Sequence, residues 1–217
     1  MKNIFKVLLI LLISINGLFA QKPYVEYWHN GKKATEGTLS DKNIRIGEWR
    51  WFYEDESLQK VGSYNEKGLK IGEWVDYFAN GKVKKQEFLT GKGECKAFFE
   101  NGQLQYSYNV EDGLKQGEYR EFYSDGKKKI QASYKDNELD GYAVWYFPDG
   151  KKDMEGNLKM GKRNGKWIYY YRINGQKGSE GEYLDDKEVG RWIYYYETSE
   201  KWREGDYRNG MREGLWN

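Results

Sequence analysis

The sequence predicts an all-β protein whose fold is an elongated, twisted antiparallel sheet of tandem β-hairpin repeats. Three observations lead to this prediction. A glycine followed by a cluster of aromatic residues recurs about every 24 residues, and in most copies an Asn-Gly or Asp-Gly dipeptide follows it nine or ten residues later. After residue 21, no stretch of helical length has apolar residues at a 3.6-residue period. The elements of the chain therefore read as short strands joined by tight turns.

The first twenty residues have the layout of a secretory signal peptide. Lys2 and Lys6 form a short basic region, residues 7–13 form an unbroken apolar run, and Ala20 is a small residue at a cleavage point before Gln21. The apolar run is shorter than the roughly 20 residues that a membrane span needs. We expect residues 1–20 to be removed during export, with an uncleaved anchor as the alternative, and residues 21–217 to form the repeat domain.

The repeat is defined by a glycine that precedes the aromatic cluster, as in Gly165-Lys-Trp167-Ile-Tyr-Tyr170-Tyr171. Successive landmark glycines from Gly47 onward are spaced by 25, 21, 24, 24, 24, 25 and 24 residues. The predicted repeats begin near residues 22, 47, 72, 93, 117, 141, 165 and 190, with a partial repeat from 214. Hairpins of this size bury no core alone, so neighbouring repeats are expected to stack.

Each repeat is predicted to form a strand, a tight turn, a second strand and a polar loop. Asn-Gly and Asp-Gly favour the type I′ turn, in which both central residues have positive φ. An aromatic pair ends the first strand, as at Tyr77 and Phe78, and alternation along the strand should place one ring on each face. The second strand carries an apolar residue at a fixed place: Leu39, Tyr64, Leu89, Tyr134, Leu158, Tyr183 and Tyr207.

These segments resemble a known family. The segment Leu158-Lys-Met-Gly161-Lys-Arg-Asn-Gly165-Lys-Trp167, and its counterpart at residues 207–216, are similar to MORN-repeat units of the variant found in YwqK-type antitoxin proteins. The resemblance covers the chain after residue 20 and implies an elongated, twisted antiparallel sheet. For function, it implies a proposed antitoxin role, protein scaffolding or membrane association. Cys95 and Ala143 depart from the pattern because they occupy the position of the repeat tryptophan.

Composition excludes several classes of function. Residues 1–20 hold two lysines and no acids, so the rest of the chain has 34 basic and 34 acidic side chains. A nucleic-acid binder normally has a basic excess, which is missing here, so no nucleic-acid partner is expected. Cys95 is the sole cysteine and His29 the sole histidine, which excludes an internal disulfide and any mechanism that needs two histidines.

Two motifs that resemble ligand-binding loops are explained by the repeat itself. Residues 156–162 read Gly-x-x-x-x-Gly-Lys, like the start of a P-loop, but Arg163 replaces the required Ser or Thr and no helix follows. Residues 136–141 begin like a calcium loop, whose twelfth position would be Phe147 and not a bidentate carboxylate. His29 is interpreted as an exposed turn residue and Cys95 as a small buried apolar side chain. We therefore predict no enzyme, no cofactor and no metal site.

Lysines follow the hairpin turns and form the one charge pattern that stands out. If all turns lie along one edge, these lysines form a ladder there. They keep edges soluble in many sheets, and the functional alternative is an edge for an anionic partner such as lipid head groups, acidic glycan or an acidic protein. The residues proposed for that edge are Lys82, Lys84, Lys85, Lys127, Lys128, Lys129, Lys151 and Lys152.

The sequence thus favours an exported, non-catalytic repeat protein that acts as a protein-interaction scaffold in the periplasm, on the outer surface or in the secreted fraction. An unknown protein is the expected partner, because long repetitive surfaces suit extended binding. Three alternatives stay open: binding of carbohydrate through exposed Tyr and Trp, association with an anionic membrane through the lysine edge, and an antitoxin or immunity role implied by the family resemblance.

Overall fold

The computed structural model describes residues 5–6 and 21–217, which are all-β. Within them there is no helix long and apolar enough to span a membrane. The predicted signal peptide lies outside the described residues, apart from Phe5–Lys6, which form β1. The prediction of an all-β antiparallel fold of tandem hairpins is confirmed. The chain divides into two compact units, an N-terminal unit (Met1–Gly102 with Val110–Gly113) and a C-terminal unit (Gln103–Asn109 with Leu114–Asn217).

In the N-terminal unit, strands that are neighbours in the chain from β2 to β8 pair antiparallel, and β1 adds to β2. The strands are β1 (Phe5–Lys6), β2 (Lys22–Tyr27), β3 (Lys33–Leu39), β4 (Arg45–Phe52), β5 (Leu58–Tyr64), β6 (Lys70–Tyr77), β7 (Val83–Phe88) and β8 (Lys92–Phe98). Strand β9 (Leu104–Glu111) divides between the two units.

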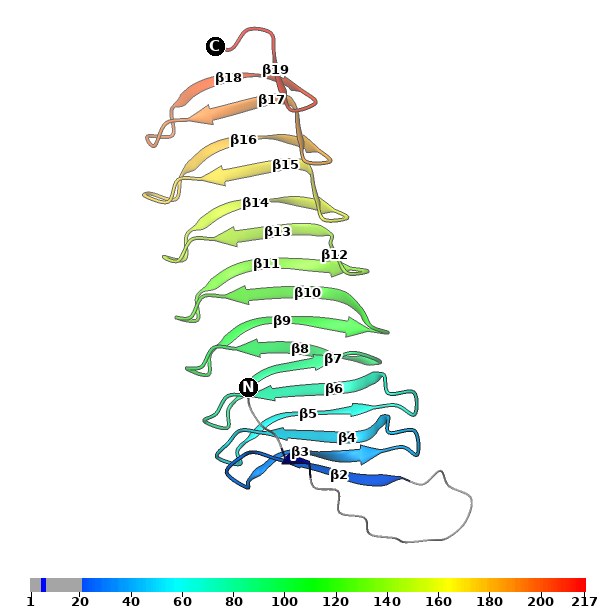
Figure 1. The fold of residues 1–217 in the computed structure, drawn as a ribbon. Helices are drawn as coiled ribbons and strands as arrows, with labels where there is room; N and C mark the ends of the chain where they lie inside the picture. The colour runs from blue at the N-terminus through cyan, green and yellow to red at the C-terminus, as the bar shows by residue number, and fades with distance from the viewer. Residues whose placement is uncertain (1–4, 7–20) are drawn as a thin grey trace. The chain divides into compact units, whose positions relative to one another are not determined.

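The C-terminal unit continues the same pattern, with hairpins stacked in chain order (Figure 1). Its strands are β10 (Leu114–Phe122), β11 (Lys128–Lys135), β12 (Glu138–Leu139), β13 (Gly141–Tyr146), β14 (Lys152–Lys159), β15 (Lys162–Tyr170), β16 (Lys177–Leu184), β17 (Lys187–Tyr195), β18 (Lys201–Arg208) and β19 (Met211–Glu213).

The hairpin turns differ from the predicted type I′. At Asn30-Gly31 only the glycine has positive φ, at 79°. The Gly31 N–H donates to the Trp28 carbonyl at 3.0 Å, and the Trp28 N–H donates to the Lys32 carbonyl at 2.8 Å. This is a three-residue loop, a type I turn closed by a left-handed residue. The prediction was wrong because the dipeptide supplies the last two positions of a three-residue loop, and the Asn30 side chain accepts the Lys32 N–H instead.

Two-residue turns with both φ values positive do occur, but in loops that join one repeat to the next. In the C-terminal unit, Met160 and Gly161 have φ of 50° and 76°, and Asp185 and Asp186 have 49° and 69°. Each such turn docks on the preceding repeat through its backbone. The Gly161 N–H, for example, donates to the Leu139 carbonyl at 2.8 Å. The two edges of the C-terminal unit therefore use different turns, whereas in the N-terminal unit the inter-repeat loops at 40–44 and 65–69 have the same three-residue form as the hairpin turns.

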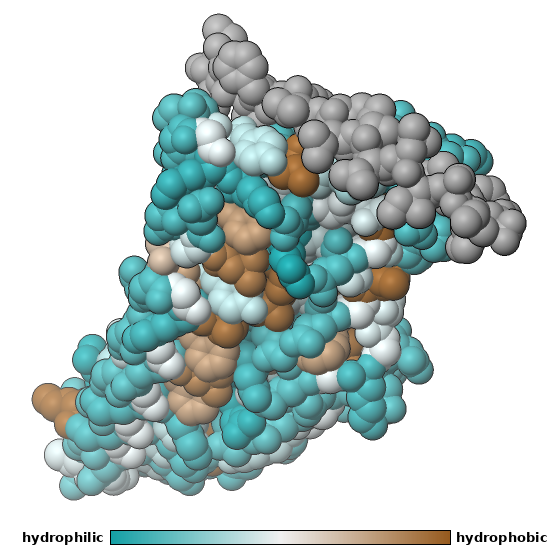
Figure 2. Space-filling model, turned by 90° about the horizontal axis from the view of Figure 1, so that it is seen from below, coloured by the Kyte–Doolittle hydropathy of each residue, from teal (hydrophilic) through white to brown (hydrophobic). Residues whose placement is uncertain are grey.

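Alternation along the strands gives each unit two faces. We call the face of Trp49 and Trp74 in the N-terminal unit, and of Trp167 and Trp192 in the C-terminal unit, the tryptophan face. All four indoles are buried. The opposite side of the sheet is the glutamate face, named after Glu155 and its counterparts in other repeats. In the view of Figure 2, hydrophilic residues cover most of the surface and hydrophobic residues gather in patches between them.

Hydrogen bonds 24 residues apart hold the repeats in register. In four repeats the second aromatic of the pair bonds the next repeat: the Tyr53, Tyr123 and Tyr171 hydroxyls donate to the Tyr77, Tyr146 and Tyr195 carbonyls, each at 2.7 Å. The Trp28 indole N–H makes the equivalent bond to the Phe52 carbonyl at 3.2 Å. These bonds fix the position of one hairpin against the next.

Candidate binding surfaces

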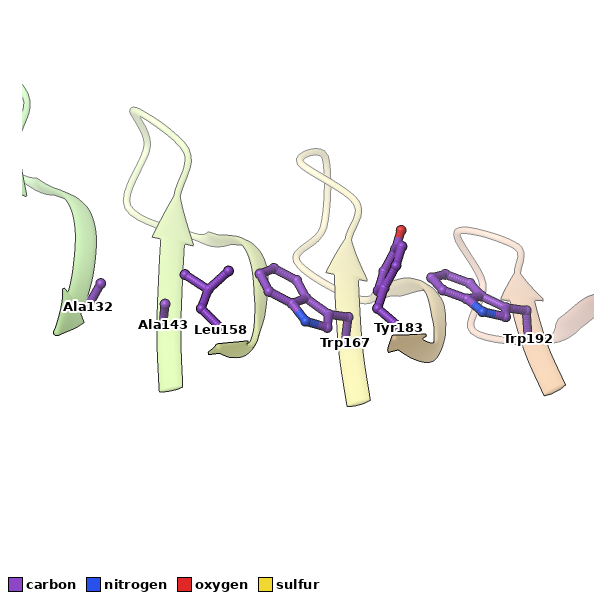
Figure 3. Close-up of a cluster of buried hydrophobic side chains, with 6 residues drawn as sticks. All are labelled: Ala132, Ala143, Leu158, Trp167, Tyr183 and Trp192. Carbon is purple, nitrogen blue, oxygen red and sulfur yellow. The ribbon is translucent and has the colours of Figure 1, made fainter. Parts of the chain in front are cut away.

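The tryptophan face is built on a second glycine in five repeats, namely Gly37, Gly62, Gly156, Gly181 and Gly205. An added Cβ at Gly181 would lie 2.2 Å from the indole of Trp192, and one at Gly156 would lie 2.4 Å from the indole of Trp167. Each indole therefore lies flat on the backbone of the preceding strand, where only glycine leaves room. Figure 3 shows the row that results, with both indoles pointing from their own strand toward the preceding one.

The fixed apolar position of the second strand completes this packing. The Tyr183 ring meets Trp192 edge-on, with ring centroids 5.1 Å apart, and meets Trp167 at 6.2 Å. Tyr64 makes the same edge contact with Trp74 at 5.2 Å. Edge-to-face geometry matches the quadrupoles of the rings, so these pairs add to the free energy gained by burial alone. A single-layer sheet thereby acquires a core without a second sheet.

Cations lie over these rings at a position that the sequence reasoning missed, two residues before the landmark glycine. The Arg45 guanidinium lies 4.6 Å from the Trp49 ring centroid, the Lys70 ammonium 4.4 Å from that of Trp74, and the Arg163 guanidinium 3.9 Å from that of Tyr183. Lys115 and Arg212 occupy the same position and also cover rings. The signal was readable as a basic residue at that position in five repeats.

A groove opens on the tryptophan face of the N-terminal unit. Its volume is about 480 Å³, and its lining combines aromatic rings, among them Trp51 and Trp74, with four cations and one acid: Arg45, Lys60, Lys70, Lys84 and Asp76. Lys60 is neutralised by Asp76 at 2.9 Å. The groove therefore carries a positive charge that the zero net charge of residues 21–217 conceals.

The glutamate face of the C-terminal unit holds carboxylates that are largely buried from solvent. Glu155, which is 7% exposed, accepts hydrogen bonds from the Tyr142 hydroxyl at 2.5 Å, from the Lys152 ammonium at 2.5 Å and from the Tyr170 hydroxyl. Burial alone would raise its pKa, but these donors outweigh burial and lower the pKa. Burial and the bond to Glu155 raise the pKa of Tyr142 to about 12.

Glu180 repeats this arrangement one hairpin later. Its carboxylate accepts a bond from the Tyr195 hydroxyl at 2.6 Å and pairs with Lys166 at 2.9 Å and Lys177 at 3.2 Å. Burial opposes its ionisation, yet the three donors lower its pKa to about 2. The tyrosine, the lysines and the acid come from neighbouring strands, so this charge network joins one repeat to the next.

We expect Glu180→Gln to lower the free energy of unfolding at pH 7 by about 1–3 kcal/mol, because the charged acceptor of three donors is lost. An unfolded glutamate has a pKa of about 4.3. The depressed folded pKa therefore stabilises the protein above that value, and the stabilisation is lost as the pH falls toward 2. Urea unfolding at a series of pH values should show the difference between variant and wild type shrinking between about pH 4.5 and 2.

The matched control is Glu182→Gln, because Glu182 is an exposed acid of the same strand. It should unfold like the wild type at every pH. An equal effect of both substitutions would mean that general charge balance, and not the Glu180 network, sets the pH dependence.

The predicted lysine edge is largely engaged by the protein's own acceptors in the C-terminal unit. The Lys127 ammonium pairs with Asp125 at 2.9 Å and donates to the Pro148 carbonyl, and Lys129 pairs with Glu121 at 2.7 Å. Lys128 donates to Gln131, Lys151 donates to the Arg172 and Ile173 carbonyls, and Lys152 bonds Glu155. Turns of this unit lie along one edge, as Figure 1 shows, so the ladder exists there but most of its charge is matched.

In the N-terminal unit, the structure separates the three lysines proposed for the same edge. Lys85 pairs with Glu87 at 2.7 Å, and the Lys84 ammonium lies 5.7 Å from the Phe78 ring centroid and lines the groove. Lys82 follows the Asn80-Gly81 turn and is exposed. Of these three lysines, only Lys82 lies on the turn edge as predicted.

Because most of the ladder is matched, we expect the purified protein to bind anionic vesicles weakly at low salt and not at physiological ionic strength. Each free lysine near such a surface contributes about 1 kcal/mol, and the attraction fades over a Debye length of about 8 Å at physiological salt. Co-sedimentation across a salt series measures this. Tight, salt-resistant binding that disappears when Lys127, Lys128 and Lys129 are changed to Gln would contradict it and favour a membrane role.

The structure also accounts for the other residues and motifs that were considered from the sequence. His29 is exposed in its hairpin loop, and Cys95 is buried, 1% exposed, with its sulfur accepting the Phe88 N–H at 3.2 Å. The glycines of the P-loop-like motif serve the repeat, since Gly156 packs under Trp167 and Gly161 lies in a two-residue turn. In the calcium-like segment, Asp136 accepts a bond from Gln116 at 2.6 Å and Asp140 one from the Met160 N–H at 3.1 Å.

Stacked hairpins that share one buried aromatic row within each unit define a tandem-repeat protein of the β-hairpin class. Four segments, residues 45–66, 70–89, 92–112 and 115–136, match the family model of the MORN repeat variant. These four segments of the chain are therefore MORN repeats of the variant type. No curated protein matches its sequence significantly.

Proposed function

We propose that the chain is an exported, non-catalytic protein that acts as a protein-interaction scaffold. The observation that carries this proposal is that side-chain bonds lock several hairpins on the next one, as the bond from the Tyr171 hydroxyl to the Tyr195 carbonyl does. A surface whose repeats are fixed in register presents its side chains at set intervals. Such a surface loses little conformational entropy when an extended partner binds.

Export is the second part of the proposal and depends on residues 1–20. Fractionation of producing cells, with mass measurement of the purified chain, tests it. The expected result is a chain that begins at Gln21 in the envelope or extracellular fraction. A full-length chain confined to the cytoplasm would overturn this part and favour the antitoxin role that the family resemblance implies, in which a co-purifying toxin is the partner.

Photo-crosslinking tests the scaffold itself. A crosslinking amino acid at an exposed site of a face, with Glu182 as one such site, should trap the same protein as equivalent sites in other repeats. A partner trapped from several repeats supports an extended interface. Crosslinks at one site alone, or none at any site, would overturn the scaffold.

Carbohydrate binding is the second candidate, and one observation favours it. Tyr196 and Trp202 are 49% and 48% exposed, and their ring centroids lie 6.0 Å apart. Two half-exposed rings side by side offer a stacking surface for a sugar, part of which the Arg203 guanidinium covers at 4.3 Å from the Trp202 ring centroid. If this candidate holds, an immobilised cell-surface polysaccharide should retain the wild type, and Trp202→Ala should abolish that retention. If the wild type is not retained either, carbohydrate binding is excluded.

A further inference from the structure

We propose that the groove on the tryptophan face of the N-terminal unit binds an acidic, extended peptide segment of a partner protein. Arg45 and Lys70 would each receive one carboxylate of that segment. The inference rests on the scaffold function proposed above and names the chemistry of the partner.

Charge is the first argument. Lys60 is matched by Asp76, whereas Arg45, Lys70 and Lys84 make no ion pair among the residues that the structure describes. Three cations thus converge on one hollow of about 480 Å³ without an acid to neutralise them. Surface cations elsewhere in the described part of the same unit commonly have one, as Lys92 does in Glu111 at 3.2 Å. The groove is complementary to a ligand with several negative charges.

The cations are also held in place before a ligand arrives. The Arg45 guanidinium rests over both Trp49 and Trp51, at 4.6 and 5.7 Å from the ring centroids, and Lys70 rests over Trp74. Cation–π contact restrains long side chains that would otherwise lose rotamer freedom on binding. Because the cations already cover these ring faces, sugar rings have less aromatic surface to stack on. This favours carboxylates over a glycan.

The C-terminal unit shows what the same position looks like when its charge is cancelled. Arg163, the counterpart of Arg45, is bound by the Asp186 carboxylate at 2.9 Å and by the Tyr169 hydroxyl at 3.1 Å. In the next repeat the position holds Glu188, an acid. An unmatched pair of cations in neighbouring repeats is thus not a requirement of the fold, and the N-terminal unit keeps Arg45 and Lys70 unmatched.

The spacing of the two cations indicates the spacing of the acids. Arg45 and Lys70 hold equivalent places in adjacent hairpins, two strand separations apart, which is about 10 Å. An extended peptide advances about 3.3 Å per residue. Acidic side chains three residues apart would therefore meet both cations, provided that the segment crosses the strands.

Fluorescence anisotropy with the purified full chain tests the proposal. The probe is a labelled peptide with two glutamates three residues apart in an otherwise neutral, non-helical sequence, beside a copy with both changed to glutamine. We expect binding of the acidic peptide alone, weakened by salt and at least tenfold weaker in the double variant Arg45→Gln, Lys70→Gln. Lys84→Gln, which removes an ammonium that lies 5.7 Å from the Phe78 ring centroid, should weaken binding less without affecting stability.

The matched control is the double variant Lys32→Gln, Lys82→Gln, which removes two charges from the turn edge of the same unit and should bind normally. Loss of binding in that control but not in the groove variant would overturn the proposal in favour of the lysine edge. Binding of dextran sulfate or anionic vesicles without binding of the peptide would overturn it in favour of a glycan or a membrane. If wild type and groove variant trap the same crosslinked partner equally, the groove proposal fails while the scaffold function stands.

Discussion

Trp167→Ala is expected to lower the free energy of unfolding by about 3–5 kcal/mol, the usual cost of truncating a large buried aromatic. The Trp167 side chain is 1% exposed, lies on the Gly156 backbone and touches rings of its own hairpin and of the preceding one. Its indole N–H also donates to the Asn157 carbonyl at 3.0 Å. The substitution therefore removes contacts between repeats as well as within one. Chemical denaturation followed by circular dichroism measures the change.

Trp202→Ala is the matched control for this prediction. Trp202 is the same residue type but 48% exposed, so its truncation should change stability by no more than about 0.5 kcal/mol. Cys95→Ala, at the tryptophan position of its own repeat, removes a smaller side chain and should cost less than Trp167→Ala. Similar effects of Trp167→Ala and Trp202→Ala would show that burial between repeats does not set the stability.

Gly181→Ala is expected to destabilise the protein by about 1–3 kcal/mol or more, because its methyl group would overlap the Trp192 indole. The nearest ring atoms are at 2.2–2.5 Å, and the indole has no space to retreat because Tyr183 and Tyr207 meet it edge-on. Gly178→Ala in the same strand is the control. Its methyl group would meet the Tyr171 ring at 3.4 Å, an ordinary contact, so this change should be neutral or slightly stabilising.

The chain itself supplies a rescue for this clash. At the equivalent place in an earlier pair of repeats, Ala132 faces Ala143, and both are buried. Gly181→Ala combined with Trp192→Ala recreates that pair, so the double variant should be more stable than the sum of the two single effects predicts. A double-mutant cycle measures this coupling. Strict additivity would contradict the proposed contact.

The periodicity of the sequence was enough to predict the hairpins but not how the repeats fit together. Every Trp and Tyr assigned to a stacking position was visible as a repeated letter. The glycine under each indole was not recognised, because it lies in the preceding repeat, eleven or twelve residues upstream, as Gly181 does for Trp192. The turn at Asn30-Gly31 was mistaken because a dipeptide does not reveal whether a loop has two residues or three. Gly93 was used as a landmark, yet it lacks the positive φ of Gly72 and Gly117 and packs against Phe88 instead.

The candidate binding surfaces could be predicted even less from the sequence, because they depend on which side chains meet in the folded protein. A lysine ladder is readable in sequence, but whether Lys127 is free or bound to Asp125 depends on side-chain geometry. Arg45 and Lys70 did not stand out because their charge is balanced elsewhere in the chain, and only their place over Trp49 and Trp74 distinguishes them. Net charge and local charge answer different questions about partners.

The placement of glycine in one repeat and tryptophan in the next has a consequence for how such chains can lengthen or shorten. A duplication of a whole repeat that carries both residues, such as residues 165–189, creates new junctions that again match a glycine with an indole. Duplication of the repeat that holds Tyr119 and Ala132 would instead place the Tyr119 ring of the second copy next to Ala132 of the first, where the chain now has Ala143. We therefore expect duplication of residues 165–189, whose new junction repeats contacts already present in the chain, to be tolerated better than duplication of the repeat that begins at 117.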